Sequence, residues 1–256
     1  MTLTAITRDV DPSISHCELT YQSRVEIEYA LAVEQHRRYQ AVLSEIGCEV
    51  VTIPAAQGLA DCVFIEDTAI VLDEVAVLCR PGAASRRPEV AGVEPVLRRF
   101  RTLASIQSPG TLDGGDLLRV GKTIYAGLST RSNQSGIDQL RAIVSDHGYT
   151  VTAVTTPSCL HLKSAVSQVA PGTLLVNPEW VGTEVFKDYQ LIEVDPEEAH
   201  AANALLVAGN VIYPTAAFPR TASRLAALGL TLLPVDVSEL QKAEGAVTCC
   251  SLILNT

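Results

Sequence analysis

This chain of 256 residues lacks a surplus of basic residues and lacks any apolar run long enough to cross a membrane. It contains 19 Lys and Arg against 29 Asp and Glu, so its net charge is −10 with the five histidines neutral. Nucleic acids and anionic lipid surfaces are bound through clustered basic side chains, and we expect neither as a partner. A membrane span needs about 18 apolar residues in succession, and no segment approaches that length.

The seven cysteines also lack the pattern of a disulfide framework or a zinc ribbon, because their number is odd and no two are separated by two residues. The first residues lack the charged and apolar regions of a secretory signal. Both observations predict a reducing, cytoplasmic location. The glycine patterns of phosphate-binding and dinucleotide-binding loops are missing as well, so we expect no nucleotide cofactor.

The chain does contain enough apolar sequence to bury a full core, with 47% hydrophobic and 19% charged residues. Three segments share one order, in which an amphipathic helix ends at a glycine and an apolar strand follows. A recurring order of this kind indicates an internal repeat. We predict helices over 24–47, 133–147 and 220–228, followed by strands over 48–53, 149–154 and 230–235.

A second pattern marks the start of each repeat, where a polar residue or a cysteine opens a short apolar strand. Starts separated by about 40 to 50 residues let five units fill the chain, with residues 1–55 completing the fifth unit. We predict one domain over 1–256, an α/β ring of five strand–turn–strand–helix–strand units with the helices outside. Pairing of the N- and C-terminal segments would close the ring and leave few sheet edges exposed. The five starting strands are 67–71, 116–118, 164–166, 203–207 and 250–254.

In such a ring the starts of the first strands converge on the central axis, although they are distant in the sequence. The residues at these starts carry carboxylates, an imidazole, an amide and a thiol. An acidic pocket with these groups is typical of an active site that binds a cation. The residues concerned are Asp61, Glu66, Asp67, Asp113, Asp116, His161, Asn203 and Cys249.

Cys249 is the candidate nucleophile and His161 the candidate acid–base, although each has a structural alternative. A free cysteine is most often a small buried core residue, but Cys249 opens a strand at the predicted pocket. Cys250 follows it and points to the opposite face of the strand, so we assign it to packing. His161 lies between two leucines at the start of another unit, where it is either a core residue or a partner for the thiol.

Five carboxylates accompany these two residues. Asp61, Glu66 and Asp67 lie at the ends of an apolar segment, where carboxylates are costly unless they are paired or face a cation. Asp113 and Asp116 flank two glycines, a sequence typical of a turn that also lets a ligand approach the backbone. The acids therefore fit either buried ion pairs and turns or the binding of a cationic substrate.

Together, these motifs resemble the dimethylarginine dimethylaminohydrolase family, a branch of the guanidino-group-modifying enzymes. The resemblance implies a five-bladed α/β propeller, known as the pentein fold. It also implies hydrolysis of methylated L-arginines to L-citrulline and dimethylamine or methylamine, by a C–N hydrolase that needs no metal and no organic cofactor. Six motifs carry the resemblance in the family's order and spacing, at 61–67, 80–87, 111–116, 127–134, 160–164 and 248–251.

The resemblance implies three catalytic residues. Cys249 would attack the guanidinium carbon and form a covalent thiouronium intermediate. His161 would act as the general acid and then as the general base, and Asp113 would orient that histidine. Some relatives carry Glu at the position of Asp113, and the shorter Asp has less reach toward the imidazole.

The resemblance also implies a substrate site with acids at one end and two arginines at the other. Asp67 and Glu66 would hold the guanidinium group. Asp61 would contact the α-ammonium group together with the backbone of a loop around residues 16–21. The two arginines, which otherwise suit the solvated surface, would hold the α-carboxylate. The full set of implied substrate contacts is Leu19, Asp61, Glu66, Asp67, Arg86, Arg131 and Ala243.

Several alternatives remain at this point. The first is an arginine deiminase, but those enzymes are longer chains with an inserted helical domain, for which 256 residues leave no room. The second is an agmatine deiminase, but agmatine lacks the carboxylate that Arg86 and Arg131 would bind. A non-catalytic ring protein would lack the Cys, His and Asp set. A zinc-binding protein could use Cys249, Cys250 and His161. The sequence is compatible with a homodimer and leaves the preferred methylarginine undecided.

Overall fold

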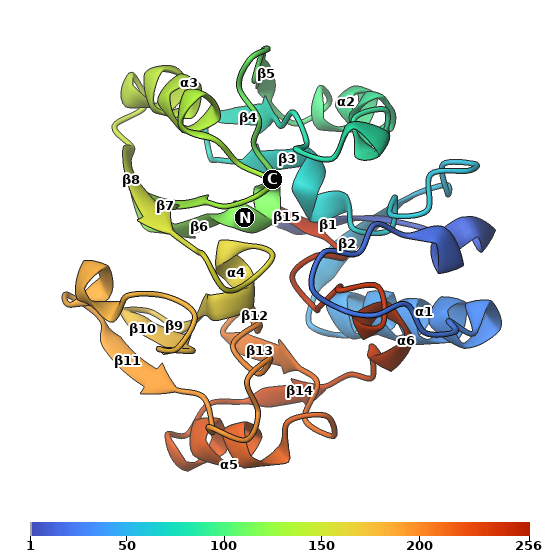
Figure 1. Cartoon of the computed structure of the whole chain (residues 1–256), viewed down its shortest axis with the longest axis vertical. Coiled ribbons are helices and arrows are strands. Elements are labelled where there is room, and N and C mark those ends of the chain that lie inside the picture. The colour runs from blue at the N-terminus through green and yellow to red at the C-terminus, as the bar shows by residue number, and fades with distance from the viewer. Residues whose placement is uncertain (1) are drawn as a thin grey trace.

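The computed structural model describes residues 2–256 as five three-stranded sheets that surround a central axis like the blades of a propeller (Figure 1). In each blade the first strand pairs antiparallel with the second, and the second pairs parallel with the third. A parallel pair requires a crossover connection, and most of these crossovers contain a helix that lies at the outside of the ring. The predicted five-bladed α/β propeller is therefore confirmed.

Four blades are formed by continuous stretches of chain. The third of them contains a short 3-10 turn, η5 (Thr183–Phe186), where the others contain an α-helix. The elements are β3 (Ala69–Val71), β4 (Val75–Leu78), α2 (Glu89–Leu97) and β5 (Thr102–Ser105); β6 (Leu117–Val120), β7 (Thr123–Leu128), α3 (Gln134–Ser145) and β8 (Thr150–Thr155); β9 (Val166–Ala170), β10 (Thr173–Val176) and β11 (Gln190–Glu193); and β12 (Leu205–Val207), β13 (Asn210–Tyr213), α5 (Pro219–Ala227) and β14 (Leu232–Pro234).

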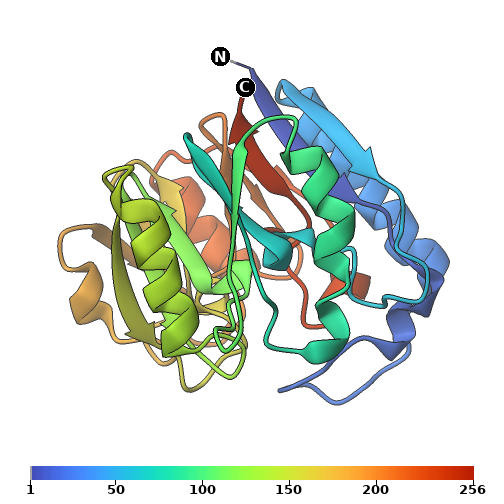
Figure 2. The ribbon, with the colours of Figure 1, turned by 90° about the horizontal axis from the view of Figure 1, so that it is seen from above.

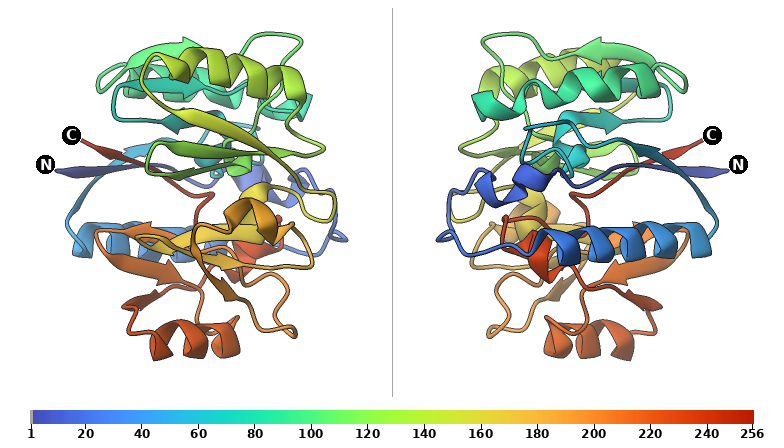
Figure 3. Two further views of the ribbon diagram at one scale, coloured as in Figure 1. Left: turned by 90° about the vertical axis from the view of Figure 1, so that its left-hand side faces the viewer. Right: turned by 90° about the vertical axis from the view of Figure 1, so that its right-hand side faces the viewer.

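The fifth blade combines the two ends of the chain. Its elements are β15 (Leu252–Asn255), β1 (Leu3–Arg8), α1 (Tyr29–Glu45) and β2 (Cys48–Ile53). β1 pairs antiparallel with β15, with Leu3 opposite Asn255. The N-terminal and C-terminal strands therefore lie side by side and extend from one face of the ring (Figures 2 and 3).

The predicted helices exist, but their ends are shifted. α3 begins where predicted because Asn133 caps it, accepting a hydrogen bond from the Gly136 N–H at 2.8 Å. α1 begins five residues later than predicted. Residues 24–28 instead belong to an irregular loop, which is joined to the rest of the ring by a 2.8 Å hydrogen bond from the Glu28 N–H to Glu239.

The predicted starting strands are corrected in a similar way, because each strand begins one or two residues later than expected. Short helical turns occupy several of these positions: η2 (Ile65–Thr68), η4 (Gly114–Asp116) and α4 (Leu162–Ala165). The turns let carboxylates accept hydrogen bonds from nearby backbone N–H groups, as Asp67 does from Gly115 at 2.8 Å. These turns, rather than the strands themselves, place the polar residues near the axis.

Packing between blades fixes the terminal segment that carries the two adjacent cysteines. Tyr39 of α1 is fully buried and donates a hydrogen bond to the Val247 carbonyl at 2.9 Å, with its hydroxyl 2.7 Å from that of Ser251. Burial of a Tyr side chain with its hydroxyl satisfied stabilises both partners. Among residues 2–256, no helix is long and apolar enough to span a membrane.

Candidate active site

A small cavity of about 20 Å³ lies among residues from several blades, enough room for about one water molecule. Of the ten residues predicted for the site, seven line this cavity. The other three do not line it, but each is next to a lining residue: Leu19 follows Glu18 and Glu66 precedes Asp67 in the sequence, and Asp113 contacts His161. The seven lining residues are Asp61, Asp67, Arg86, Arg131, His161, Ala243 and Cys249.

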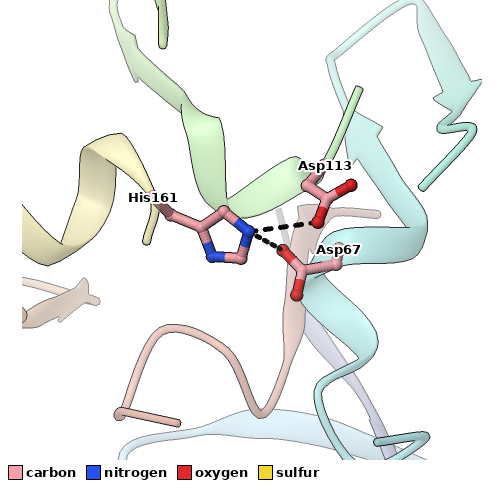
Figure 4. A group of neighbouring side chains, drawn as sticks. All are labelled: Asp67, Asp113 and His161. Carbon is pink, nitrogen blue, oxygen red and sulfur yellow. Dashed lines mark hydrogen bonds and ion pairs between the residues drawn. The ribbon is translucent and has the colours of Figure 1, made fainter. Parts of the chain in front are cut away.

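His161 contacts two buried carboxylates with the same nitrogen (Figure 4). Its Nε2 lies 3.1 Å from Asp113 Oδ2 and 3.8 Å from Asp67 Oδ1. Asp113 is itself oriented, because its other oxygen accepts a hydrogen bond from the Gly82 N–H at 2.8 Å. Burial alone would lower the pKa of His161, but Asp67 and Asp113 outweigh burial and raise it to about 9. The imidazole is therefore protonated at neutral pH.

The two glycines beside Asp113 are required by the approach of other parts of the site. A Cβ atom on Gly114 would lie 1.9 Å from the Glu66 carbonyl oxygen, and one on Gly115 would lie 2.6 Å from His161 Nδ1. No side chain fits at either position without displacing the site. The sequence suggested that these glycines admit a ligand; the structure shows that they admit the backbone at Glu66 and the imidazole.

Cys249 is held by the residues on each side of its own backbone. Its carbonyl accepts a hydrogen bond from the Glu66 N–H at 3.1 Å. The preceding Thr248 donates its hydroxyl to Glu66 at 2.8 Å and its N–H to Asn203 at 3.1 Å. Burial, together with the charges of Glu66 and Asp67, raises the pKa of the Cys249 thiol to about 12. The thiol is therefore neutral in the empty site.

Cys250 belongs to the hydrophobic core, as predicted, although it lies in a turn before β15 rather than in the strand itself. Its side chain is fully buried and its thiol lies 3.4 Å from the Ala246 carbonyl. The thiol packs among residues of α1 and of the terminal segment. The two adjacent cysteines thus occupy different environments, one at the cavity and one in the core.

Arg86 is more enclosed than a residue at the rim of a pocket. It is 3% exposed, its Nη1 lies 2.6 Å from Asp67, and its Nη2 lies 2.9 Å from Glu89. Nη2 also donates to the Phe64 carbonyl at 3.1 Å. Burial would raise the pKa of Asp67, but His161 and Arg86 hold it below its usual range. A surface position for Arg86 is therefore wrong, and most of its N–H groups already have protein partners.

Arg131 has fewer partners. Its guanidinium donates to the Thr20 hydroxyl at 3.1 Å and lines the cavity. On the same side of the cavity, Asp61 accepts the Glu18 N–H at 3.0 Å. Burial raises the pKa of Asp61, with Arg86 opposing the shift. Leu19 lies between these two contacts and is partly buried, so its backbone is held close to the cavity.

Glu66 does not line the cavity and instead forms an ion pair with Lys163. Burial raises the pKa of Glu66, with Lys163 opposing the shift. Asp116 is also outside the cavity, where it accepts hydrogen bonds from Ser129, Ser132 and the Leu162 N–H. It therefore fixes the turn that carries His161, rather than facing a ligand.

Asp67, Asp113 and His161 bring three metal-ligand atoms within 4.8 Å of one another. Over residues 2–256 this is the one such group of three, and it contains no cysteine. The zinc site considered from Cys249, Cys250 and His161 is therefore not formed. The protonated His161 and Arg86 already supply positive charge to both carboxylates.

Sequence reasoning missed Glu89, Lys163 and Glu244 as parts of this site. Glu89 lies three residues after Arg86, a spacing that could have indicated an ion pair on one turn. Lys163 lies in the predicted motif at 160–164, but its partner is 97 residues away in the chain. No local pattern marks Glu244, whose partners lie more than 220 residues away.

Comparison with known proteins shows which family this site belongs to. The sequence matches the family model described as "N,N dimethylarginine dimethylhydrolase, eukaryotic" over residues 12–254. The chain belongs to the dimethylarginine dimethylaminohydrolase family. A relative from Streptomyces coelicolor, named N(G),N(G)-dimethylarginine dimethylaminohydrolase, is 38% identical over 251 residues, which cover 98% of this chain and 96% of the relative.

Solved structures of dimethylarginine dimethylaminohydrolase superpose on nearly the whole chain. The Pseudomonas aeruginosa protein, as a cysteine-to-serine variant complexed with citrulline, is 34% identical with a TM-score of 0.95, covering 99% of this chain and 100% of that one. A histidine-to-glycine variant, in an adduct with S-methyl-L-thiocitrulline, is 35% identical with the same TM-score and coverage. The resemblance expected from the six motifs is therefore confirmed at the level of the family.

Proposed function

We propose that this protein hydrolyses Nω-methylated L-arginines, dimethylarginine and monomethylarginine, to L-citrulline and dimethylamine or methylamine. The observation that carries the proposal is a single cavity lined by Cys249, His161 and two buried carboxylates, in a chain of this family. The relative solved with citrulline supports the product side of the reaction.

The charges of the cavity fit the two ends of the substrate. Asp67 lies beside the thiol and the imidazole, where it would orient the guanidinium carbon toward the sulfur of Cys249. Asp61 would face the α-ammonium group, together with the Leu19 backbone. Arg131 has the more available guanidinium of the two arginines and would be the main contact for the α-carboxylate. Arg86 can add only the N–H that Asp67 and Glu89 leave unused.

In the first half of the reaction, the Cys249 thiol gives up its proton to solvent and its sulfur bonds to the guanidinium carbon, while the carbon–nitrogen π electrons move onto nitrogen to give a neutral tetrahedral adduct. The bond from this carbon to the methylated nitrogen then breaks. His161 donates a proton to the departing amine, which its raised pKa allows at neutral pH. Dimethylamine or methylamine leaves, and a thiouronium remains on the sulfur.

In the second half, His161 has lost its proton and can act as a base. It takes a proton from water, whose oxygen bonds to the same carbon. The carbon–sulfur bond then breaks as the new hydroxyl becomes the carbonyl of citrulline, and its remaining proton returns to the departing sulfur to restore the neutral thiol. The histidine-to-glycine relative solved as an adduct supports a covalent stage in this family, because a site without the base would retain such a species.

The nucleophile in this scheme depends on the substrate for its activation. In the empty cavity, burial and the charges of Glu66 and Asp67 keep the Cys249 thiol neutral, with a pKa of about 12. A guanidinium group bound beside the sulfur offsets those negative charges and favours the thiolate. Neutral molecules of similar shape would bring no such charge and would react slowly.

Turnover of four related compounds tests the proposal. Asymmetric dimethylarginine, monomethylarginine, arginine and agmatine are incubated separately with the protein, and both the ureido product and the released amine are measured. We expect citrulline and an equal amount of dimethylamine from asymmetric dimethylarginine. Folded protein that releases no amine from either methylated arginine, or that turns over agmatine faster than both, would contradict the proposal.

The two adjacent cysteines provide a matched pair of variants for the same assay. We expect Cys249→Ser to abolish turnover, because a hydroxyl at this position is a much weaker nucleophile. Cys250→Ser should retain most of it, since that thiol packs in the core and only its contact with the Ala246 carbonyl changes. Equal losses in the two variants would exclude Cys249 as the nucleophile.

A further inference from the structure

The loop between η1 (Pro12–His16) and α1 lies on the face of the ring opposite to the chain termini (Figures 2 and 3), and its Glu18 lines the active-site cavity. It contains no regular secondary structure, and within residues 17–28 only Cys17 and Ile27 are buried. Tyr21 and Val25 are about half exposed. Because so little apolar surface is buried, polar contacts must hold this loop in place.

Glu244 makes the largest group of those contacts. Its carboxylate accepts the Thr20 N–H at 3.0 Å and the Tyr21 and Gln22 N–H groups at 2.6 Å each. Three backbone donors on one carboxylate form charge-assisted hydrogen bonds, which are stronger than neutral ones. The carboxylate needs no ion pair because these N–H groups satisfy it.

The backbone of Glu244 is also unusual. Its φ angle is +57°, in the left-handed region that residues other than glycine seldom adopt. The next position is crowded as well, because a Cβ atom on Gly245 would lie 2.2 Å from the Phe64 ring. Strained backbone of this kind persists where the surrounding structure requires it, and is common at functional sites.

Glu244 also lies between two cavities. It lines the small inner cavity of about 20 Å³ that Cys249 also lines, and it lines an outer cavity of about 590 Å³. The outer cavity is within the size range of ligand pockets and is lined by Gln22 and Ser23 of the same loop. A methylated arginine is many times larger than the water molecule that the inner cavity can hold, so the loop must move before substrate enters.

We propose that Glu244 is a positioning residue that latches the loop of residues 17–28 over the active site. Together with the contacts of Glu18 with Asp61 and of Thr20 with Arg131, the latch holds the Leu19 backbone beside the inner cavity. It also separates that cavity from the outer one. Substrate enters when the three N–H groups of the loop leave Glu244. The part of this inference that concerns substrate rests on the proposed function, but the latch itself can be tested without substrate.

Alkylation of Cys249 by iodoacetamide, a small neutral reagent, measures opening of the loop directly. We compare the wild type with Glu244→Gly, which removes the carboxylate and suits a positive φ, and with Glu244→Gln, which keeps one acceptor oxygen. Peptide mass spectrometry gives the alkylation rate of each cysteine. We expect Cys249 to react at least about tenfold faster in Glu244→Gly, because three charge-assisted hydrogen bonds are lost. Glu244→Gln should fall between the two.

A matched control is Glu198→Gln. Glu198 also accepts two backbone N–H groups, from Arg220 at 2.9 Å and Thr221 at 2.8 Å, but contacts no residue of the loop. We expect Cys249 to react at the wild-type rate in this variant. Cys79 and Cys159 are buried elsewhere in the ring and should react at unchanged rates in all variants.

Steady-state kinetics on asymmetric dimethylarginine complete the test. We expect Glu244→Gly to raise KM by about tenfold while kcat stays within about twofold, because the latch positions Leu19 and touches neither Cys249 nor His161.

An unchanged alkylation rate of Cys249 in Glu244→Gly would overturn the latch. Equal acceleration at Cys79, Cys159 and Cys249 would also overturn it and make Glu244 a general structural residue. Faster alkylation of Cys249 alone, without any methylarginine hydrolysis, would support the latch and count against the proposed function.

Discussion

Replacing Arg86 by methionine removes a guanidinium that joins two buried carboxylates while keeping a side chain of similar length. Asp67 lies 2.6 Å and Glu89 lies 2.9 Å from this guanidinium, and all three side chains are less than 5% exposed. Removing one partner of a buried ion pair costs about 3–5 kcal/mol, since the other charge stays buried. For a domain of this size each kcal/mol lowers Tm by about 2–4 °C. We therefore expect Tm to fall by roughly 6–20 °C.

Thermal unfolding followed by circular dichroism at pH 7 measures this change, with Arg131→Met as the control. Arg131 contacts the Thr20 hydroxyl rather than a buried carboxylate, so its replacement costs about 1 kcal/mol and lowers Tm by only a few degrees. Arg86→Met should therefore be much less stable than Arg131→Met. A decrease in Tm for Arg86→Met no larger than that of the control would refute the role assigned to the buried network.

The pH dependence of the difference in Tm between Arg86→Met and wild type provides a second check. Without Arg86, burial raises the pKa of Glu89 further above its unfolded value, as burial already does in the intact protein, and the pKa of Asp67 moves upward because one of the two positive charges that lower it is lost. A carboxylate with a raised pKa destabilises the fold above that pKa, and protonation relieves the cost as the pH falls. The Tm difference between Arg86→Met and wild type should therefore shrink between pH 7 and pH 5. A difference that grows on acidification would contradict this account.

Three further variants test the proposed roles of individual residues. Arg131→Ala should raise KM for methylarginine by about ten- to a hundredfold, the value of a charge-assisted contact, and leave agmatine turnover unchanged; equal losses on both compounds would exclude a carboxylate contact. Asp113→Asn should lower kcat by about 10²–10⁴-fold. It should also move the alkaline limb of the pH–rate profile below the pKa of about 9 found for His161, because the carboxylate that stabilises the imidazolium is lost; an unmoved limb would mean that Asp113 does not control this histidine. His161→Gly should accumulate a covalent adduct on Cys249, seen by intact-protein mass spectrometry after acid quench, and rapid multiple turnover would assign the base elsewhere.

The five-bladed ring could be predicted from the sequence because its signals are local and repeated. Gly47, Gly148 and Gly229 were expected to end helices, and all three have positive φ values of 92°, 75° and 79°. At these positions a glycine leaves the helix at little cost, and a strand follows each one. The number of blades came from a second pattern, the five predicted starting strands separated by about 40 to 50 residues. The third blade was harder to predict, since a 3-10 turn replaces its helix.

The start of each strand could not be placed as well. Apolar residues at 69–71 and 117–118 mark strands, but the preceding acids were expected to begin those strands rather than to lie in η2 and η4. A turn of this kind is stabilised by partners from another blade, such as the hydrogen bond from the Gly115 N–H to Asp67. Sequence patterns contain no information on those partners.

The burial of Arg86 could not be predicted from the sequence either. A loop arginine is usually solvated, and the family resemblance suggested contact with a ligand. In the structure, Asp67 from one turn and Glu89 from the next helix meet on this guanidinium. The number of buried negative charges around a position, rather than its own residue type, decides whether an arginine is buried there. That number depends on how the blades pack.

The charge distribution explains how one site can combine selectivity with low reactivity at rest. Glu66 and Asp67 help raise the pKa of the Cys249 thiol to about 12, and the carboxylates around His161 raise its pKa to about 9. The empty site therefore contains a neutral nucleophile and a protonated acid, and a neutral electrophile gains little by entering. In the proposed mechanism, a guanidinium substrate supplies the positive charge that offsets the carboxylates and lowers the thiol pKa. Because the same acids bind the cation and suppress the thiolate, the chemical step begins only with the substrate that the site is built to hold.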